Sequence, residues 1–392
     1  MKKKKIKITL LGRIGIAIAL GIAVGWFSPE WLARVMATFN SVFGSFLGFL
    51  IPFIIVGFVT PAIAAIGSRA GKLLVWTALL AYGSTLFAGF LNYYTGTLTF
   101  PFLIHGVEGM TLVEDSAEVK PYFKVDIPAM LPVMTALVLA FMLGLGIAYK
   151  KLTVLGQAAE EFREIVLLTI NGVILPLLPV YIFGIFMNMT HTGQVGTILM
   201  TFAKIIVVIF VLHVFILVLQ YCIAGALSKR NPIKMLKTML PAYFTALGTQ
   251  SSAATIPVTL EQTMKMGVSK DIAGFVVPLC ATIHMSGSTL KIVACALAIM
   301  VMQGMPHDAA MFGNFIAMLG VTIIAAPGIP GGAIMASLGL LTSILGFSEE
   351  QNALMIALYI AMDSFGTACN VTGDGAIATI IDRFFGKNRA KQ

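Results

Sequence analysis

The sequence predicts an all-α membrane protein that crosses the bilayer several times, and three observations support this prediction. First, 58% of its 392 residues are hydrophobic and only 11% are charged, whereas a soluble domain carries about 25% charged residues. Second, apolar stretches long enough to cross a bilayer as a helix, ~20 residues, recur along the chain. Third, the basic residues behind the net charge of +9 lie in short runs between these stretches. Such runs are typical of loops at an anionic membrane surface rather than of a nucleic-acid-binding face.

The first 228 residues contain six apolar spans, and basic residues alternate between the segments that join them. Lysine or arginine lies before the first span and after the second, fourth and sixth spans, whereas the other joins contain few basic residues. The positive-inside rule therefore predicts a cytoplasmic N-terminus. The basic C-terminal segment predicts a cytoplasmic C-terminus as well, so the number of full crossings should be even. The spans lie at about 8–27, 38–66, 71–92, 127–149, 165–187 and 199–228.

The next apolar segment is interrupted in its middle by the polar run GTQSSAATIP, residues 248–257. Lys237 precedes this segment, and Lys265 and Lys270 follow it. A full crossing would place one of these basic flanks outside, so we expect a re-entrant hairpin at about 241–268 that opens to the cytoplasm. The alternative is an ordinary helix with a kink.

A second interrupted segment, LGVTIIAAPGIPGGAIMASLGLL at 319–341, has glycine and proline at its centre. It lies between apolar spans at about 271–302 and 350–384, so we expect another re-entrant hairpin, at about 311–345, that opens to the outside. Non-helical backbone at membrane depth is stable only inside protein or next to water. Two such breaks, each followed by a span, predict inverted repeats around a binding site near the bilayer midplane.

The last span carries a stripe of polar side chains. Asp363, Thr367, Asn370 and Asp374 are spaced so that all four share one face of a helix. A carboxylate within the membrane is costly unless it is paired with a cation, and the first basic residue after the stripe is Arg383. We therefore expect a bound metal ion or ammonium group at this face, with oxygen ligands that suit a hard ion such as sodium. The alternative is a structural network of hydrogen bonds between helices.

The span at 271–302 contains a second polar run, ATIHMSGSTLKI. His284, Ser288 and Lys291 lie on one face of the predicted helix, and Gly287 weakens the helix between them. A single histidine in such a span is more often a hydrogen-bonded core residue than a ligand. Lys291 lies several turns from either interface, which makes snorkelling of its ammonium to the surface a poor explanation.

Four motifs, in their order and spacing, resemble the signature regions of the dicarboxylate/amino acid:cation symporters, the family of glutamate and neutral amino acid transporters. They are QSSAATIP (250–257), CATIHMSGST (280–289), PGIPGG (327–332) and DSFGTACNVTGD (363–374). The resemblance covers almost the whole chain. It implies eight transmembrane helices and two re-entrant hairpins, assembled as a homotrimer. It also implies a transport domain that moves as an elevator against a fixed scaffold.

The resemblance divides the chain into a scaffold and a transport core. Residues 1–70 and 127–228 are expected to be mainly scaffold and trimerisation helices, and 71–126 to hold the third helix and an extracellular loop. The transport core is expected at 238–392. Within it lie the first hairpin (241–268), the seventh helix (271–302), the second hairpin (311–345) and the eighth helix (350–384).

The resemblance also implies a role for individual residues. Asp363 would bind the ammonium of an amino acid substrate, and Asn370 its α-carboxylate. The remaining substrate-binding residues would be Ser251, Ser252, Ser288, Ile329, Gly366 and Thr367. Asp374 would supply carboxylate oxygens to one of two sodium ions. The other sodium ligands, largely main-chain carbonyls divided between two sites, would come from Cys280, Thr282, His284, Met285, Ile323, Ile324, Ala326 and Asn370.

Three departures from the family pattern refine this picture. Gly366 replaces the arginine of members that carry acidic substrates, and Gln250 replaces a second arginine, so bidentate capture of a side-chain carboxylate is lost. The family motif NMDGT reads HMSGS at 284–288. The hydroxyl ligands of the third span align with Leu80 and Ala81, so we expect no third sodium site.

The third departure is Lys291, which stands where an uncharged residue is expected. We hypothesise that its ammonium, or a protonated His284, replaces the missing third sodium ion as a coupling cation. A rival use of Lys291 is to bind an acidic substrate in place of the missing arginine.

The leading prediction is therefore a sodium-coupled symporter of a small neutral amino acid in the plasma membrane. The alternative within the class is a proton-coupled or acidic amino acid/dicarboxylate symporter that uses Lys291 and His284. A channel would need repeated rings of charge or carbonyls along a pore, and the sequence contains no such repetition. An enzyme using Ser251 or Ser252 with His284 is not supported, because no G-x-S-x-G or H-E-x-x-H motif occurs.

Overall fold

A computed structural model describes residues 10–68, 71–104, 119–191, 193, 195–324, 326 and 330–386, and within these ranges the chain is all-α, without strands. The first part of the chain forms α1 (Leu10–Gly25), α2 (Glu30–Ser68), α3 (Lys72–Ile104), α4 (Val133–Lys150), α5 (Thr153–Thr169), a π-helical turn (Ile170–Ile174), α6 (Leu175–His191) and α7 (Val195–Ser228). The second part forms α8 (Pro232–Thr249), α9 (Ser252–Lys265), α10 (Lys270–Ile283), α11 (Ser286–Met302), α12 (Ala309–Ile324), α13 (Gly332–Leu345), α14 (Glu349–Ala361) and α15 (Asp363–Phe385).

Within the described residues, six helical segments are long and apolar enough to cross a membrane, and a seventh is counted if the bent pair α14–α15 is one span. These segments include 270–302, which is α10 and α11 together. The predicted last span is not straight, because α14 and α15 meet at an angle of 61°. The chain is thus a multi-pass membrane protein, while the exact number of eight crossings stays a prediction.

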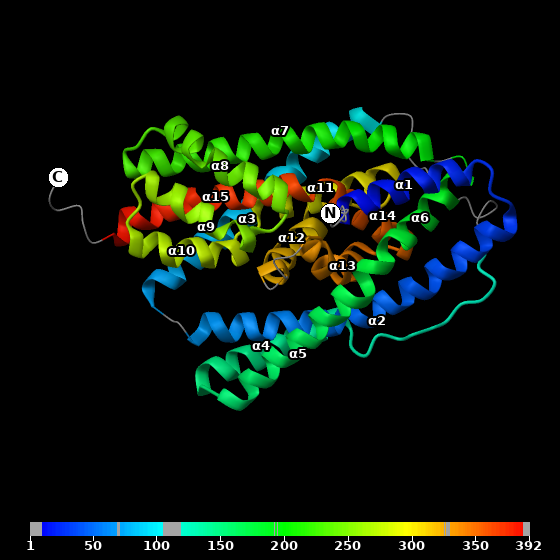
Figure 1. Ribbon diagram of the computed structural model, residues 1–392, viewed down its shortest axis with the longest axis horizontal. Coiled ribbons are helices and arrows are strands. Elements are labelled where there is room, and N and C mark those ends of the chain that lie inside the picture. The colour runs from blue at the N-terminus through cyan, green and yellow to red at the C-terminus, as the bar shows by residue number, and fades with distance from the viewer. Residues whose placement is uncertain are drawn as a thin grey trace, which may run out of the picture.

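Each predicted hairpin consists of two short helices packed against each other, α8 with α9 and α12 with α13 (Figure 1). The first pair turns at Gln250, which adopts left-handed backbone geometry (φ 55°), and at Ser251, whose hydroxyl accepts a hydrogen bond from the amide of Ala254. Capping by a serine hydroxyl satisfies an amide left unpaired at the start of a helix. The side of the membrane from which each hairpin enters stays a prediction.

The helices form two groups in space. In Figure 1, α2, α4 and α5 lie along one side of the molecule, and α7, α8 and α15 along the other. The helix α2 packs against α4, α5 and α6, and α1 packs against α6. The helix α7 packs against α8, α11 and α15, and α3 packs against α11, so both contact helices of the predicted transport core. The functional division into scaffold and core remains a prediction.

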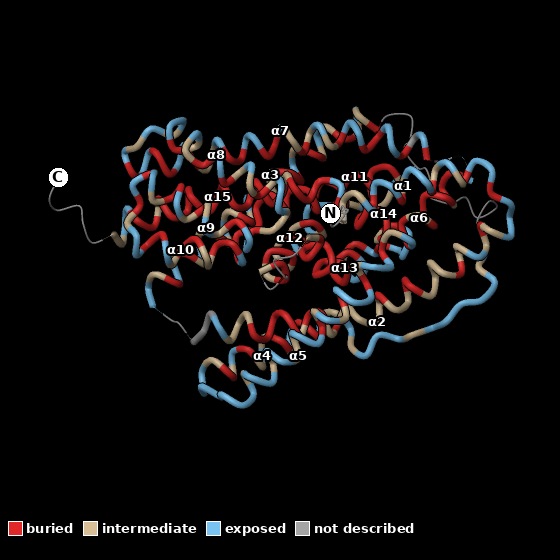
Figure 2. The backbone as a smooth tube through the Cα atoms, in the orientation of Figure 1, coloured by how far each residue is buried: buried red, intermediate tan, exposed pale blue. Residues whose placement is uncertain are grey.

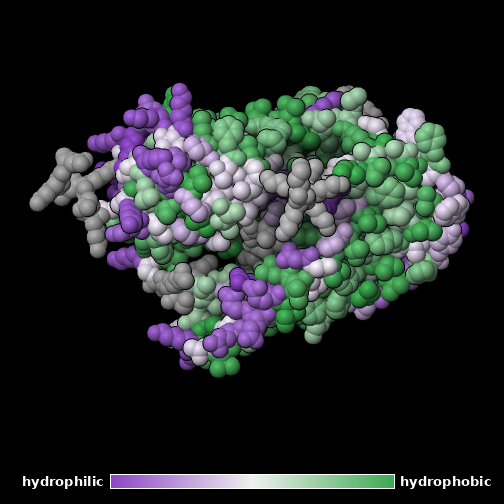
Figure 3. Space-filling model, viewed as in Figure 1, coloured by the Kyte–Doolittle hydropathy of each residue, from purple (hydrophilic) through white to green (hydrophobic). Residues whose placement is uncertain are grey.

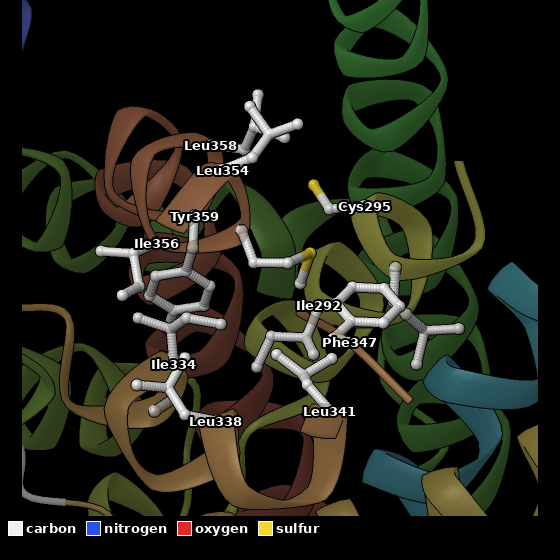
Figure 4. Close-up of a cluster of buried hydrophobic side chains, with 14 of the residues drawn as sticks. Ile292, Cys295, Ile334, Leu338, Leu341, Phe347, Leu354, Ile356, Leu358 and Tyr359 are labelled. Carbon is white, nitrogen blue, oxygen red and sulfur yellow. The ribbon is translucent and has the colours of Figure 1, made fainter. Parts of the chain in front are cut away.

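The core of the molecule is centred on α11, every residue of which is buried (Figure 2). A helix that is apolar on all sides is stable when other helices surround it, and α3, α7, α12, α13, α14 and α15 all pack against α11. Figure 4 shows one part of this core, where side chains of α11, α13 and α14, Ile292, Leu338 and Tyr359 among them, form one cluster. The polar residues of α11 are therefore held inside protein rather than in lipid.

The surface separates apolar and polar regions along the long axis of the molecule (Figure 3). Hydrophilic residues gather at the end where Figure 1 shows the α4–α5 and α7–α8 turns and the C-terminal end of α15. These two turns contain or adjoin basic residues, including Lys150, Lys151, Lys229 and Arg230. The basic joins after the fourth and sixth predicted spans thus lie at the same end, as the positive-inside argument requires.

Candidate functional site

Interruptions in several helices meet around α11. The chain leaves the helical path at His284 and Met285, between α10 and α11, and bends at Met362, between α14 and α15. The helix α15 packs against both α10 and α11. Interrupted helices expose backbone amides and carbonyls as well as side chains, so this region can bind charged groups inside the membrane.

The first feature of the site is a buried ion pair between α11 and α15. The ammonium Nζ of Lys291 lies 2.8 Å from Oδ1 of Asp363, and the two side chains are 0% and 4% exposed. The other carboxylate oxygen of Asp363 accepts a hydrogen bond of 2.8 Å from the amide of Gly331. Nζ also lies 3.5 Å from the ring centroid of Tyr359 and 3.4 Å from the carbonyl oxygen of Met362. Both charges are therefore compensated within the protein.

The second feature is the space above Gly366 in which the lysine lies. A Cβ atom added to Gly366 would lie 2.4 Å from Cε and 2.7 Å from Nζ of Lys291. Both distances are shorter than van der Waals contact. The absence of a side chain at residue 366 thus makes room for the end of Lys291.

The third feature is a set of hydrogen bonds that links Asn370 to the start of α11. Its Oδ1 accepts bonds from the amides of Gly287 (2.8 Å) and Ser288 (3.3 Å), and its Nδ2 donates to the Ser288 hydroxyl at 3.0 Å. The Tyr359 hydroxyl donates to the same serine oxygen at 3.1 Å. Tyr359 therefore connects Asn370 with Lys291.

A second buried pair lies further along α15, at Asp374. The imidazole Nδ1 of His284 is 2.9 Å from Oδ1 of Asp374, and both side chains are almost fully buried. Nε2 of the same ring lies 3.1 Å from the Ser84 hydroxyl of α3, which accepts a bond of 2.9 Å from Gln220 of α7. A Cβ atom added to Gly373 would lie 2.6 Å from the imidazole. As at Gly366, a glycine provides the space for a cationic or polar side chain from α10–α11.

The structure brings Ser84 and Thr85 of α3, rather than Leu80 and Ala81, next to the break between α10 and α11. Leu80 and Ala81 were expected at the position of the hydroxyl ligands, but Ala81 belongs to an apolar cluster with residues of α10 and α15. Ser84 lies next to His284 instead, and the Thr85 hydroxyl accepts from the amide of Met285 at 3.2 Å. The absence of a third sodium site stays a prediction.

Comparison with known proteins shows to which family the chain belongs. The family model described as "Sodium:dicarboxylate symporter family" matches residues 10–384. The chain belongs to this family. This is a family of transporters and not of enzymes.

Curated relatives are identical to this chain at about a third of the aligned positions. The human protein named "Excitatory amino acid transporter 5" is 33% identical over 216 residues, which cover 54% of this chain and 37% of that relative. The human and mouse proteins named "Excitatory amino acid transporter 2" are 32% and 33% identical over 157 residues. The chain spans about a third of the length of the curated relatives that it matches, so their activities extend to this symporter only as proposals.

The structure brings half of the eight predicted substrate-binding residues together. Asp363 and Gly366 contact the Lys291 side chain. Ser288 and Asn370 are linked to it through Tyr359, and Thr367 is buried on α15. Ser251 and Ser252 lie at the start of α9, where Ser251 caps the helix. Ile329 lies outside the described residues.

The predicted sodium ligands are placed less uniformly. The carbonyl of Cys280 accepts a hydrogen bond from the amide of His284, and that of Ile323 accepts one from Ala326. Met285 is buried next to Asn370, and Ile324 is the last residue of α12. Thr282 lies on the exposed side of α10, with its hydroxyl bonded to Leu279. The carboxylate of Asp374 is bonded by the imidazole of His284 at 2.9 Å.

Several residues at the site were not predicted from the sequence: Ser84, Thr85, Gln220, Gly331 and Tyr359. Two signals could have identified some of them. Tyr359 precedes Asp363 by four positions, a spacing that brings side chains close together on neighbouring helical turns. Gln220 and His213 are polar residues seven positions apart in the long apolar helix α7, and the ring of His213 lies 3.1 Å from the carbonyl of Gly287.

Proposed function

We propose that this symporter couples sodium entry to the uptake of a small neutral amino acid by an elevator mechanism, as a homotrimer in the plasma membrane with cytoplasmic termini. The observation that carries the substrate proposal is the Lys291–Asp363 pair. Its charges cancel, so a substrate without net charge preserves the balance of the buried site. An arginine at residue 366, which would capture a second carboxylate, is replaced by glycine.

A neutral amino acid, which is a zwitterion, would be bound by both its ammonium and its α-carboxylate. Its ammonium would bond to Asp363, and its α-carboxylate would bond to the amide of Asn370 and to the amides at the start of α9. The first turn of a helix has unpaired N–H groups and a positive dipole end, both of which favour a carboxylate. Ser251 and Ser252 lie at this end of α9, in agreement with the predicted role of the first hairpin.

Sodium would be the coupling ion, with Asp374 as its carboxylate ligand and main-chain carbonyls of α10, α12 and α15 as the others. Oxygen ligands of this kind suit hard cations. The Asp374–His284 contact of 2.9 Å supports the alternative, a carrier coupled to protons, because the imidazole is placed on the carboxylate that sodium would need.

The position of Lys291 above Gly366 supports a second candidate substrate. In that candidate, the Lys291 ammonium replaces the missing arginine and bonds the side-chain carboxylate of an acidic amino acid or the second carboxylate of a dicarboxylate. A lysine offers a point charge rather than a bidentate fork, so such a substrate would be bound less specifically than by arginine.

Uptake into proteoliposomes tests the proposal. Labelled serine, threonine, alanine and aspartate are each supplied with an inward sodium gradient, and again in choline with an inward proton gradient. The expected result is sodium-driven uptake of a neutral amino acid that the Asp363→Asn variant lacks. Preference for aspartate would favour the acidic candidate, and uptake driven by protons alone would replace sodium as the coupling ion.

A further inference from the structure

The Lys291 ammonium occupies the position that the substrate's ammonium must take. Asp363 offers two carboxylate oxygens, of which one accepts from the Gly331 amide at 2.8 Å and the other from Lys291, also at 2.8 Å. An incoming amino acid therefore competes with Lys291 for Oδ1. Lys291 is thus more than a distant compensating charge, because its ammonium makes the bond to Asp363 that the substrate's ammonium would make.

We propose that Lys291 is a tethered substitute for the substrate's ammonium: it neutralises Asp363 in the empty carrier and is displaced when an amino acid binds. The proposal rests on the proposed function and adds a step to the transport cycle. The empty carrier crosses the membrane with its own lysine on Asp363, so its return requires no counter-transported cation.

The need for such a substitute follows from burial. The carboxylate of Asp363 lies inside a membrane protein with its side chain 4% exposed, and an unpaired charge in this setting is strongly unfavourable. When substrate leaves, an isolated Asp363 would oppose movement of the empty core across the bilayer. The bond from Lys291 removes this obstacle.

The Lys291 ammonium has two favourable contacts besides its bond to Asp363. Its Nζ already lies 3.5 Å from the centroid of the Tyr359 ring and within 3.4 Å of the Met362 carbonyl. Attraction between an ammonium and an aromatic face is strongest where both are desolvated. These two contacts can therefore retain the ammonium after its bond to Oδ1 is broken.

The test compares Lys291→Met with the wild type in three measurements on the full-length purified protein: equilibrium binding of serine, serine/serine exchange, and net uptake into empty proteoliposomes. Exchange never requires the empty carrier to cross, whereas net uptake does. We expect binding to become tighter by about tenfold, because a competitor has been removed. Exchange should stay within about threefold of the wild type, and net uptake should fall by at least about tenfold.

Two further variants separate this role from a structural one. Lys291→Ala should regain part of its net uptake when n-propylammonium, which has the atoms that the substitution removes, is added on both sides of the membrane. Lys270→Met, which changes an exposed lysine of the same broken span, should behave as the wild type in all three measurements. If Lys291→Met does not fold, as judged by its unfolding temperature, Lys291→Gln takes its place.

Weaker serine binding in the Met or Gln variant would overturn the proposal, because Lys291 would then hold the substrate. Equal loss of exchange and net uptake, with no response to n-propylammonium, would also overturn it. Failure of the proposed function looks different: the wild type itself would then take up no neutral amino acid.

Discussion

The end of the Lys291 side chain lies directly above the α-carbon of Gly366, where a Cβ atom would be 2.4 Å from Cε. Two residues that are 75 positions apart in the sequence thus share one small volume beside Asp363. The first atom of any side chain at residue 366 would overlap the lysine, so a larger residue there requires the end of Lys291 to move.

Gly366→Ala tests this relationship. We expect the added methyl group to move Lys291 away from Asp363 and to reduce serine uptake by at least about tenfold, because overpacking a buried site costs about 1–3 kcal/mol. Uptake in proteoliposomes measures the effect. The matched control is Gly274→Ala on α10, where an added Cβ would meet nothing within 4 Å. Uptake unchanged by Gly366→Ala would contradict the tight contact.

His284→Asn restores the residue of the family motif and removes the imidazole from Asp374. If sodium uses the Asp374 carboxylate, the sodium concentration for half-maximal uptake should fall by about threefold to tenfold, since a net hydrogen bond is worth about 0.5–1.5 kcal/mol. Uptake measured over a range of sodium concentrations reveals this. Ser84→Ala, which leaves the His284–Asp374 contact in place, is the control. A rise in the sodium requirement would indicate that the imidazole assists the coupling ion.

The sequence was sufficient to predict that the polar residues of α15 lie inside the protein. The spacing of Asp363, Asn370 and Asp374 follows from the helical repeat alone, and the structure buries all three. A polar interruption between basic flanks likewise predicted the pair α8–α9, and glycine and proline at the centre of the second segment predicted the pair α12–α13.

Relationships between helices could not be predicted in the same way. The periodicity of α11 places Lys291 on a face but does not say that Asp363 is its partner, since this depends on how α11 and α15 pack. The position of Ser84 was missed for the same reason: counting from Lys72 gives no depth for a helix of 33 residues that extends to Ile104. The bend of 61° at Met362 has no glycine or proline beside it, so the last span was predicted as one continuous segment.

The glycines of α1 make a prediction about stability. A Cβ atom added to Gly21 or Gly25 would lie within 2.7 Å of a backbone carbonyl of α6, as expected where small residues four apart let two membrane helices approach closely. Gly25→Leu should lower the unfolding temperature in detergent, with a loss of about 1–3 kcal/mol from overpacking. Gly15→Leu on the same helix, where nothing lies within 4 Å, should have little effect. Equal stability of the two variants would contradict close packing of α1 on α6.

Two substitutions of Tyr359 distinguish the contact of its ring with Lys291 from the hydrogen bond of its hydroxyl. Tyr359→Phe keeps the ring beside Lys291 and removes only the hydrogen bond of 3.1 Å to Ser288, whereas Tyr359→Leu removes the ring as well. Since the ring is the contact that would retain the displaced lysine, the leucine variant should bind serine more weakly, by about tenfold or more if the desolvated cation–π contact is worth about 2 kcal/mol. The phenylalanine variant should change binding by no more than about threefold to tenfold, as for one neutral hydrogen bond. Equilibrium binding of serine to the purified variants measures both effects, with unfolding temperatures as the check on folding. Equal losses in the two variants would assign the effect to the hydroxyl and Ser288, and Lys291 would then need another partner when the amino acid is bound.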